Sequence, residues 1–182
     1  MALKSTTSAY GNVAVIIHWL SALFILIMIG SGLTAASLTA NDAKVFVLSI
    51  HAPLGVIILL LTLARVVWWK FADRKPLPLE DEPGWQTRIA GAVHFLFYVV
   101  IFGMAITGIG MMVSSGAASV LFGGSQEPLP DFWNYLQRRP HGAGARLLIL
   151  LFALHAGAAL YHHFIARDVP LKRMWFSHGG IK

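Results

Sequence analysis

Four histidines lie within long apolar stretches of this chain: His18, His51, His141 and His155. Neutral imidazole is a good ligand for iron, and a polar residue inside a membrane segment usually marks function. The last two are separated by 155 − 141 = 14 residues, which is almost four helical turns and corresponds to about 21 Å along a helix. A single helix would therefore present two imidazoles on nearly the same face at two depths.

The other two histidines supply a partner at each depth. If the N-terminus is on the inner side of the membrane, as the charge distribution below predicts, His18 lies near the inner end of its apolar stretch and His51 lies near the outer end of the next one. Depth therefore pairs His51 with His141 in the outer half and His18 with His155 in the inner half. Two such pairs can hold two haems, one above the other. An iron with two axial imidazoles passes single electrons but has no open position, so we predict one-electron conduction across a membrane.

Three further polar residues leave alternatives open. On depth alone, His94 or His162 could replace His155 as the inner ligand. His162 lies 162 − 155 = 7 residues beyond His155, about two turns, where a redox carrier could dock. Arg65 lies 65 − 51 = 14 residues beyond His51, and it could pair with a haem propionate or extend its guanidinium to the headgroups. A membrane histidine can also be a simple hydrogen-bond partner between helices.

Small residues follow three of the four histidines. They would leave room for a flat porphyrin, or they would serve close helix packing without any haem. These residues are Gly55 after His51, Gly142 and Gly144 after His141, and Ala156 and Gly157 after His155.

The composition indicates which elements must carry these residues. Of the 182 residues, 57% are hydrophobic and only 12% are charged, which is typical of a membrane protein. A bilayer core about 30 Å thick needs about 20 apolar residues of helix. Helices are expected at about residues 13–36, 46–69, 88–113 and 142–166. The first is longer than the apolar core of a signal peptide, about 7 to 15 residues, and is expected to be retained. We predict a single all-α membrane domain, a four-helix transmembrane bundle in up-down-up-down order.

Cysteine and charge narrow the function further. The chain has no cysteine, which excludes iron–sulfur clusters and covalent haem attachment. The net charge is +6, but the basic residues fall at membrane edges, which argues against nucleic acid binding. Their distribution follows the positive-inside rule and predicts that both termini are cytoplasmic. The inner side has Lys4, Arg65, Lys70, Arg74, Lys75, Arg88, Arg167, Lys172, Arg173 and Lys182, and the outer side has Lys44, Arg138, Arg139 and Arg146.

Over nearly its whole length, the chain resembles the bacterial cytochrome b561 family, four-helix di-haem proteins of the inner membrane. The resemblance implies two non-covalent b haems, the inner one held by His18 and His155 and the outer one by His51 and His141. It is carried by Ile17-His18-Trp19-Leu20, His51 with Gly55, Arg65, His94, His141, Leu154-His155-Ala156 and His162-His163.

The resemblance also implies partners. Similar proteins exchange electrons with ubiquinone, and contacts with it are expected near His162 and His94. For some members the outer donor is superoxide, so the activity here would be that of a superoxide:quinone oxidoreductase. The four outer basic residues would attract such an anion, although phospholipid headgroups would suit them equally well. A homodimer or a separate redox partner stays open.

Two other functions compete with this interpretation. A cytochrome b anchor subunit of a hydrogenase or formate-dehydrogenase-type complex shares the four-helix plan, and it would copurify with an iron–sulfur partner. A haem-free transporter or structural bundle would show no b-type absorption spectrum.

Overall fold

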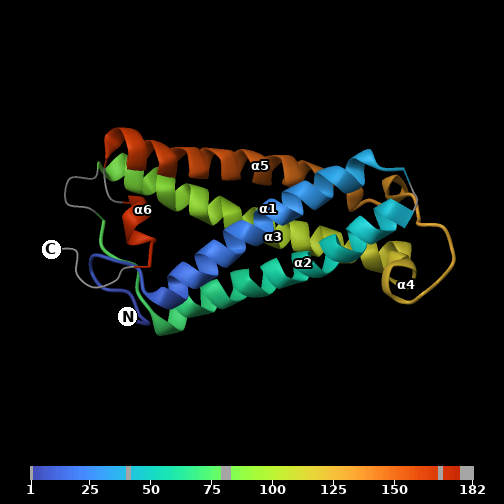
Figure 1. Ribbon diagram of the computed structural model, residues 1–182, viewed down its shortest axis with the longest axis horizontal. Helices are drawn as coiled ribbons and strands as arrows, with labels where there is room; N and C mark the ends of the chain where they lie inside the picture. Colours follow the sequence, from blue (N-terminus) through green and yellow to red (C-terminus); the bar gives the residue numbers. More distant parts are fainter. Residues whose placement is uncertain (1, 40–41, 79–82, 168–169, 177–182) are drawn as a thin grey trace.

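A computed structural model of the protein describes residues 2–39, 42–78, 83–167 and 170–176 (Figure 1). In this part of the chain every regular element is a helix. The long helices are α1 (Asn12–Ser37), α2 (Asp42–Val67), α3 (Gly84–Ser115) and α5 (Arg138–Tyr161). A π-helical turn, η1 (Trp68–Ala72), extends α2, and a second, η3 (His162–Ala166), extends α5. Of the residues considered above, Lys182 lies outside the described ranges.

Four helical segments are long and apolar enough to cross a membrane: Asn12–Ser37, Asp42–Ala72, Gly84–Ser115 and Arg138–Ala166. This confirms the prediction of an all-α protein with four such helices, while their order of crossing stays a prediction. Each segment extends beyond the predicted range because polar residues at its ends continue the helix. The fourth begins at Arg138, so His141 lies inside its first turn rather than before it.

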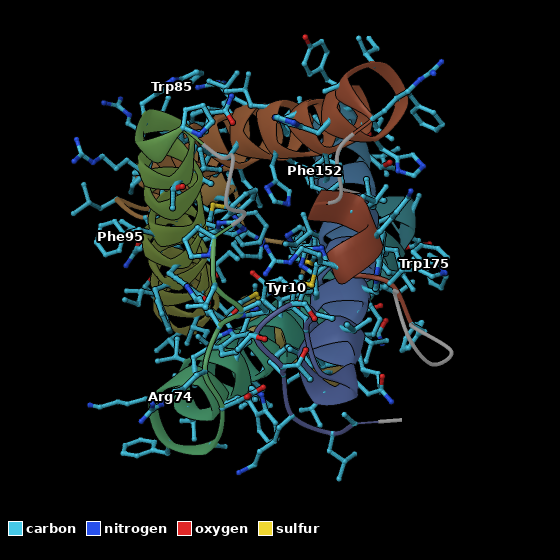
Figure 2. All side chains as sticks on the ribbon, turned by 90° about the vertical axis from the view of Figure 1, so that its left-hand side faces the viewer. Tyr10, Arg74, Trp85, Phe95, Phe152 and Trp175 are labelled. Carbon is cyan, nitrogen blue, oxygen red and sulfur yellow. The ribbon has the colours of Figure 1, made fainter. Side chains whose placement is uncertain are left out.

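The long helices form two hairpins. α1 packs mainly against α2, and α3 packs mainly against α5, while α2 and α3 also touch. We call α1 with α2 the first hairpin and α3 with α5 the second hairpin. Viewed from one end, the four helices surround a common interior, with Phe152 directed inward and Trp85 and Phe95 directed outward (Figure 2).

A small apolar core lies between the hairpins. Its residues are Ile25 of α1, Ile58 of α2, Val100 of α3, and Leu148 and Leu151 of α5. Most other large hydrophobic side chains face outward; Phe95, for example, is 65% exposed. The lipid of a bilayer would cover this surface, since a membrane bundle needs no larger apolar core of its own.

The two ends of the bundle are closed differently. At the end away from the N-terminus, the short helix α4 (Ala117–Phe122) and the 3-10 turn η2 (Phe132–Asn134) follow α3 (Figure 1). Gly116 has a φ of 68°, a left-handed conformation that favours glycine and lets the chain leave α3 sharply. We call this end outer and the end with the N-terminal segment inner, in line with the predicted orientation.

At the inner end, hydrogen bonds join three segments that are distant in sequence. The side chain of Arg173, in α6 (Pro170–Arg173), donates to the carbonyls of Ser8 at 2.8 Å and Leu77 at 2.6 Å. The indole of Trp19 donates to the Met174 carbonyl at 2.8 Å. The N-terminal segment, the α2–α3 connection and α6 are thereby held together over the inner end.

Asp73 makes a second group of hydrogen bonds between segments at this end. Its carboxylate accepts hydrogen bonds from Ser5 Oγ at 2.8 Å, from the Ser5 backbone amide at 3.0 Å and from the Trp68 indole at 3.2 Å. The backbone amide of Arg74 adds another at 2.8 Å. Burial raises the pKa of Asp73, but the bonds from Ser5, Arg74 and Trp68 outweigh it and hold the pKa below its usual value.

This carboxylate gives a prediction with a defined pH dependence. A lowered folded pKa means that the stabilisation is present above the unfolded pKa of about 3.9 and is lost as the pH falls through the folded pKa. At pH 7, Asp73→Ala should lower the free energy of unfolding by about 1 kcal/mol and expose Lys4 to trypsin. Thermal unfolding and timed proteolysis in detergent check this. Asp131→Ala, which removes a comparable cap at the outer end, should leave Lys4 protected; equal cleavage in both variants contradicts the assignment.

Candidate functional site

The outer half of the bundle brings together His51 of α2 and His141 of α5, whose ring centroids are 6.4 Å apart. These residues come from different hairpins. Nδ1 of His51 lies 2.9 Å from Ser31 Oγ of α1, and Nδ1 of His141 lies 3.1 Å from Thr107 Oγ1 of α3. Each imidazole is therefore bonded within its own hairpin and faces the imidazole of the other.

The two hydroxyls determine which ring nitrogen carries the proton. Ser31 directs its hydroxyl to the Met28 carbonyl at 3.2 Å, and Thr107 directs its hydroxyl to the Gly103 carbonyl at 2.7 Å. With its one proton directed to that carbonyl, each hydroxyl oxygen is assigned as the acceptor from its histidine, and Nδ1–H is then the donor. Nε2 is then left with a free lone pair, which is the form of imidazole that binds a metal.

The inner half gathers four polar residues, one from each long helix. His18 of α1 and His155 of α5 have ring centroids 6.1 Å apart. His94 of α3 lies closer to His155, at 5.2 Å. Nη2 of Arg65, from α2, donates to Nδ1 of His18 at 3.0 Å. The predicted inner residues thus come together, with His94 as an additional neighbour.

The spacing of the rings tests whether these pairs fit a haem. A metal–imidazole bond of about 2.0–2.1 Å places each ring centre about 3 Å from the metal, so an axial pair has centroids about 6 Å apart. The pairs His51–His141 at 6.4 Å and His18–His155 at 6.1 Å fit this value. The His94–His155 distance of 5.2 Å is shorter. Since the porphyrin itself occupies the equatorial positions, two imidazoles are what a haem site requires from the protein.

Helix α5 contributes one histidine to each of these two pairs. The helix runs without interruption from Arg138 to Tyr161, so its two histidines are separated by about 21 Å along the axis. Iron sites at these two depths would therefore lie one in the outer half and one in the inner half of the bundle.

The contact of Arg65 with His18 must change if His18 is to bind iron through Nε2. Arginine only donates hydrogen bonds, so this contact makes Nδ1 of His18 the acceptor and leaves the proton on Nε2. Coordination through Nε2 requires the opposite tautomer, and Arg65 would then be free for another acceptor, such as a propionate. In this structure the side chain of Arg65 bonds to His18 inside the bundle, and its pairing with a propionate stays a prediction.

The remaining histidines contact different groups. Nδ1 of His94 donates to the Ala90 carbonyl of its own helix at 2.7 Å. The ring of His162, in the first position of η3, meets the ring of Tyr161 edge-on at 5.7 Å. The neighbouring His163 is half-buried, and its Nδ1 has no hydrogen-bond partner among the described residues.

Two glycines that the sequence did not single out lie against the outer imidazoles. A Cβ on Gly32 would be 3.2 Å from Cε1 of His51, and a Cβ on Gly108 would be 3.2 Å from Cε1 of His141. This is tighter than an ordinary carbon contact, so larger residues would push the rings. In both cases a hydroxyl residue precedes the glycine, but Ser115-Gly116 at the end of α3 has the same pattern, so the pattern alone does not identify the two positions.

The glycines that were expected to leave room beside the ligands have other neighbours. A Cβ on Gly144 would be 2.7 Å from the sulfur of Met104, and a Cβ on Gly55 would be 3.4 Å from Cε of Met28. Both therefore allow close contact between neighbouring helices, as in the packing alternative. Gly157 has open space around it.

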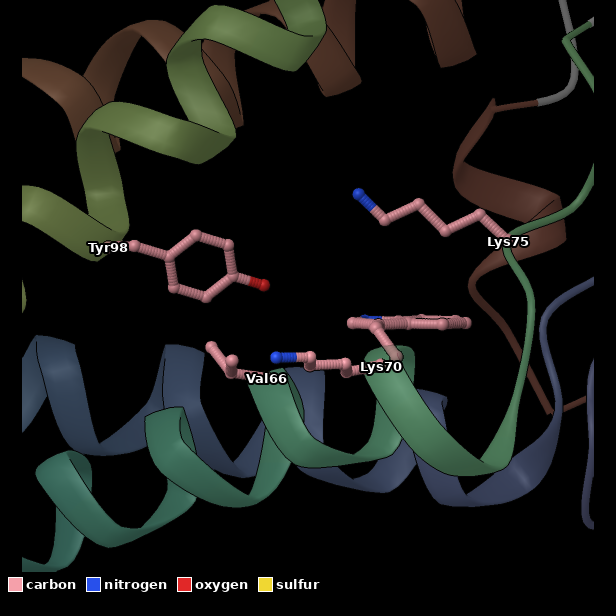
Figure 3. Close-up of a pocket in the computed structure, with 5 residues that line it drawn as sticks. Val66, Lys70, Lys75 and Tyr98 are labelled. Carbon is pink, nitrogen blue, oxygen red and sulfur yellow. The ribbon is translucent and has the colours of Figure 1, made fainter.

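A shallow depression of about 360 Å³, open to the surface, lies between α2 with its extension η1, the α2–α3 connection and α3 (Figure 3). Val66 and Trp69 supply its apolar lining. Tyr98, Lys70 and Lys75 line the same space, and their polar ends are seen in Figure 3. Sequence reasoning missed Tyr98, although it follows His94 by one helical turn.

Comparison with known proteins gives a consistent result. The family model described as prokaryotic cytochrome b561 matches residues 9–177. Cytochrome b561 homolog 1 of Escherichia coli K12 is 25% identical, over 91% of this chain and 96% of its own length. Homolog 2 of the same organism is 28% identical, over 96% and 95%. A probable superoxide oxidase CybB of Yersinia pestis is 25% identical, over 91% and 94%.

The ring spacings predict how histidine variants will bind haem. His155→Ala should lose only the inner haem and His141→Ala only the outer one, so each should bind half the haem of the parent protein. His94→Ala should keep both, because its ring is not at axial spacing from His155. The haem-to-protein ratio and reduced-minus-oxidised spectra measure this. Loss of a haem in His94→Ala together with full haem content in His155→Ala would contradict the ligand assignment.

Proposed function

The chain belongs to the prokaryotic cytochrome b561 family, and we propose that it is a di-haem b-type cytochrome that transfers electrons across the bacterial inner membrane. The observation that carries this proposal is the presence of two imidazole pairs at axial spacing, 6.1 and 6.4 Å, at two depths. His18 and His155 would hold the inner haem, and His51 and His141 the outer one. When bound, the haems would supply one-electron transfer between the two depths.

The residues around the pairs favour electron transfer over ligand chemistry. If both imidazoles of each pair hold a haem, no position would remain for oxygen to bind. The apolar core residues lie between the two sites and place no polar side chain of their own there.

We assign the electron donor to the outer end and name superoxide as the donor. Among the relatives is a probable superoxide oxidase, and the outer end carries basic residues that would attract an anion. The guanidinium of Arg138 lies 4.4 Å from the centre of the Trp133 ring, three residues before His141. Each superoxide would leave as oxygen after giving up one electron. Two such events would reduce one quinone, which also takes up two protons.

We assign the electron acceptor, ubiquinone, to the inner end. The pocket between α2 and α3 offers an apolar wall in Trp69 and hydrogen-bond donors in Tyr98 and Lys75 for a quinone carbonyl. His94, one turn from Tyr98, and His162, at the inner end of α5, are candidates to pass protons to the reduced carbonyl oxygens. With both termini cytoplasmic, these protons would come from the cytoplasm.

Stopped-flow reduction of the purified protein tests this function. Superoxide should reduce the haems, and ubiquinone should reoxidise them. The reduction rate should fall about tenfold when the ionic strength rises from about 10 to about 150 mM, because the screening length drops from about 30 to about 8 Å. A neutral quinol donor serves as the control, since its rate should not depend on salt.

Three outcomes would contradict the proposal in different ways. Absence of a b-type reduced-minus-oxidised spectrum indicates a haem-free bundle. Tight copurification of an iron–sulfur protein that is required for reduction indicates an anchor subunit. Haem reduction no faster than the spontaneous loss of superoxide excludes superoxide as the donor.

The quinone pocket has its own test. Tyr98→Phe and Lys75→Gln should raise the ubiquinone concentration needed for half-maximal reoxidation about tenfold, the effect of losing one strong hydrogen bond. Both variants should keep two haems and the parent reduction rate by superoxide. Tyr135→Phe, which removes a hydroxyl from the outer loop, is the matched control. Unchanged quinone dependence in both pocket variants would place the quinone elsewhere.

A further inference from the structure

The two outer imidazoles are held by the same device on different helices. In α1, Ser31 accepts the hydrogen bond of the α2 imidazole, and the next residue, Gly32, leaves the space that its ring fills. In α3, Thr107 and Gly108 do the same for the α5 imidazole, which also bonds the Met104 backbone carbonyl. We call these two dipeptides the hydroxyl–glycine sockets. They lie in different hairpins, and the imidazoles they hold face each other across the bundle.

The inner imidazoles have different neighbours. The guanidinium of Arg65 donates to Nδ1 of His18, and the rings of His94 and Phe97 meet the ring of His155 edge-on at 5.2 and 5.6 Å. The hydroxyl–glycine sockets are thus a property of the outer pair, where each imidazole has a neutral oxygen as its Nδ1 acceptor.

We propose that Ser31 and Thr107 are positioning residues of the outer iron site and set its reduction potential. This inference rests on the proposed function, because it requires an outer haem bound to His51 and His141. Each hydroxyl keeps the proton on Nδ1 and directs Nε2 towards the metal. A hydrogen bond from Nδ1–H to oxygen also makes the imidazole a stronger electron donor. A stronger donor favours ferric iron, so both hydroxyls lower the potential of the outer site.

A redox titration of the full-length protein tests the hydroxyls. Ser31→Ala and Thr107→Val should each raise the midpoint potential of the outer haem, and the double variant should change the ratio of reduced to oxidised iron about tenfold, a shift of about 59 mV for one electron. The inner potential should not move. Thr107→Ser restores the hydroxyl and should restore the potential. The outer signal is identified as the one that His141→Ala lacks.

Matched controls separate this effect from a general loss of helix stability. Ser37→Ala removes a hydroxyl that donates to the carbonyl three residues earlier, a bond that Ser31 makes in addition to its contact with His51. Thr62→Val removes a buried hydroxyl bonded to the carbonyl four residues earlier, as Thr107 also is. Neither touches an imidazole in the contacts above, so both controls should keep the parent potentials.

The glycines provide a second, steric test. Gly32→Ala and Gly108→Ala should weaken binding of the outer haem by about 10- to 100-fold, the range typical for disturbed metal-ligand supports. Gly30→Ala, in α1 where a Cβ meets nothing within 4 Å, is the control. Haem content after graded removal of haem by an apo-globin acceptor measures the loss.

Each possible result either supports or overturns the proposed role of the hydroxyl–glycine sockets. A selective rise of the outer potential in the hydroxyl variants, with intact controls, supports the proposal, and selective loss of the outer haem in the glycine variants supports the steric part of it; a fall of the outer potential in the hydroxyl variants would overturn it. Parent potentials and haem affinity in every socket variant, or equal shifts of both haems, would overturn it. A parent protein without two b haems would instead overturn the proposed function, so the two failures are distinguishable.

Discussion

An imidazole inside a bilayer needs a hydrogen-bond partner from the protein, because no water is available there. The hydroxyls of Ser31 and Thr107, the guanidinium of Arg65 and the carbonyl of Ala90 supply partners for Nδ1 of four different histidines. Each partner lies in the same hairpin as its histidine. Helix packing within a hairpin therefore decides which nitrogen is used, and contact between hairpins decides which imidazoles face each other.

The same constraint divides the bundle into layers. Ile58 lies seven residues from both His51 and Arg65, and Leu148 lies seven residues from both His141 and His155. Two turns of helix therefore separate the apolar core from the polar layer on either side. The layer between the histidine pairs contains no charged side chain among the core residues. An apolar partition between two polar sites suits electron transfer, since electrons cross it while ions do not.

The sequence was informative about features that lie along a single helix, where the helical period and the free-energy cost of a polar residue in a membrane segment can be read directly. Hydropathy predicted four long helices, and the spacing of 14 residues placed His141 and His155 on one face of α5. The sockets could not be predicted, because serine and threonine in membrane helices usually bond their own backbone. Ser31 and Thr107 do this as well, and only the rotation of the neighbouring helix shows that each also receives an imidazole.

The difference between the two layers bears on the direction of electron flow. Near the inner pair, the positive charge of Arg65 favours the less positive, ferrous state of an iron. At the outer pair, oxygen acceptors on Nδ1 favour the ferric state. If the two haems are bound as proposed, both effects would make the inner site the stronger electron acceptor. Electrons that enter at the outer end would then run downhill towards the end where the Tyr98 pocket lies, and no rearrangement of the helices is needed to give them that direction.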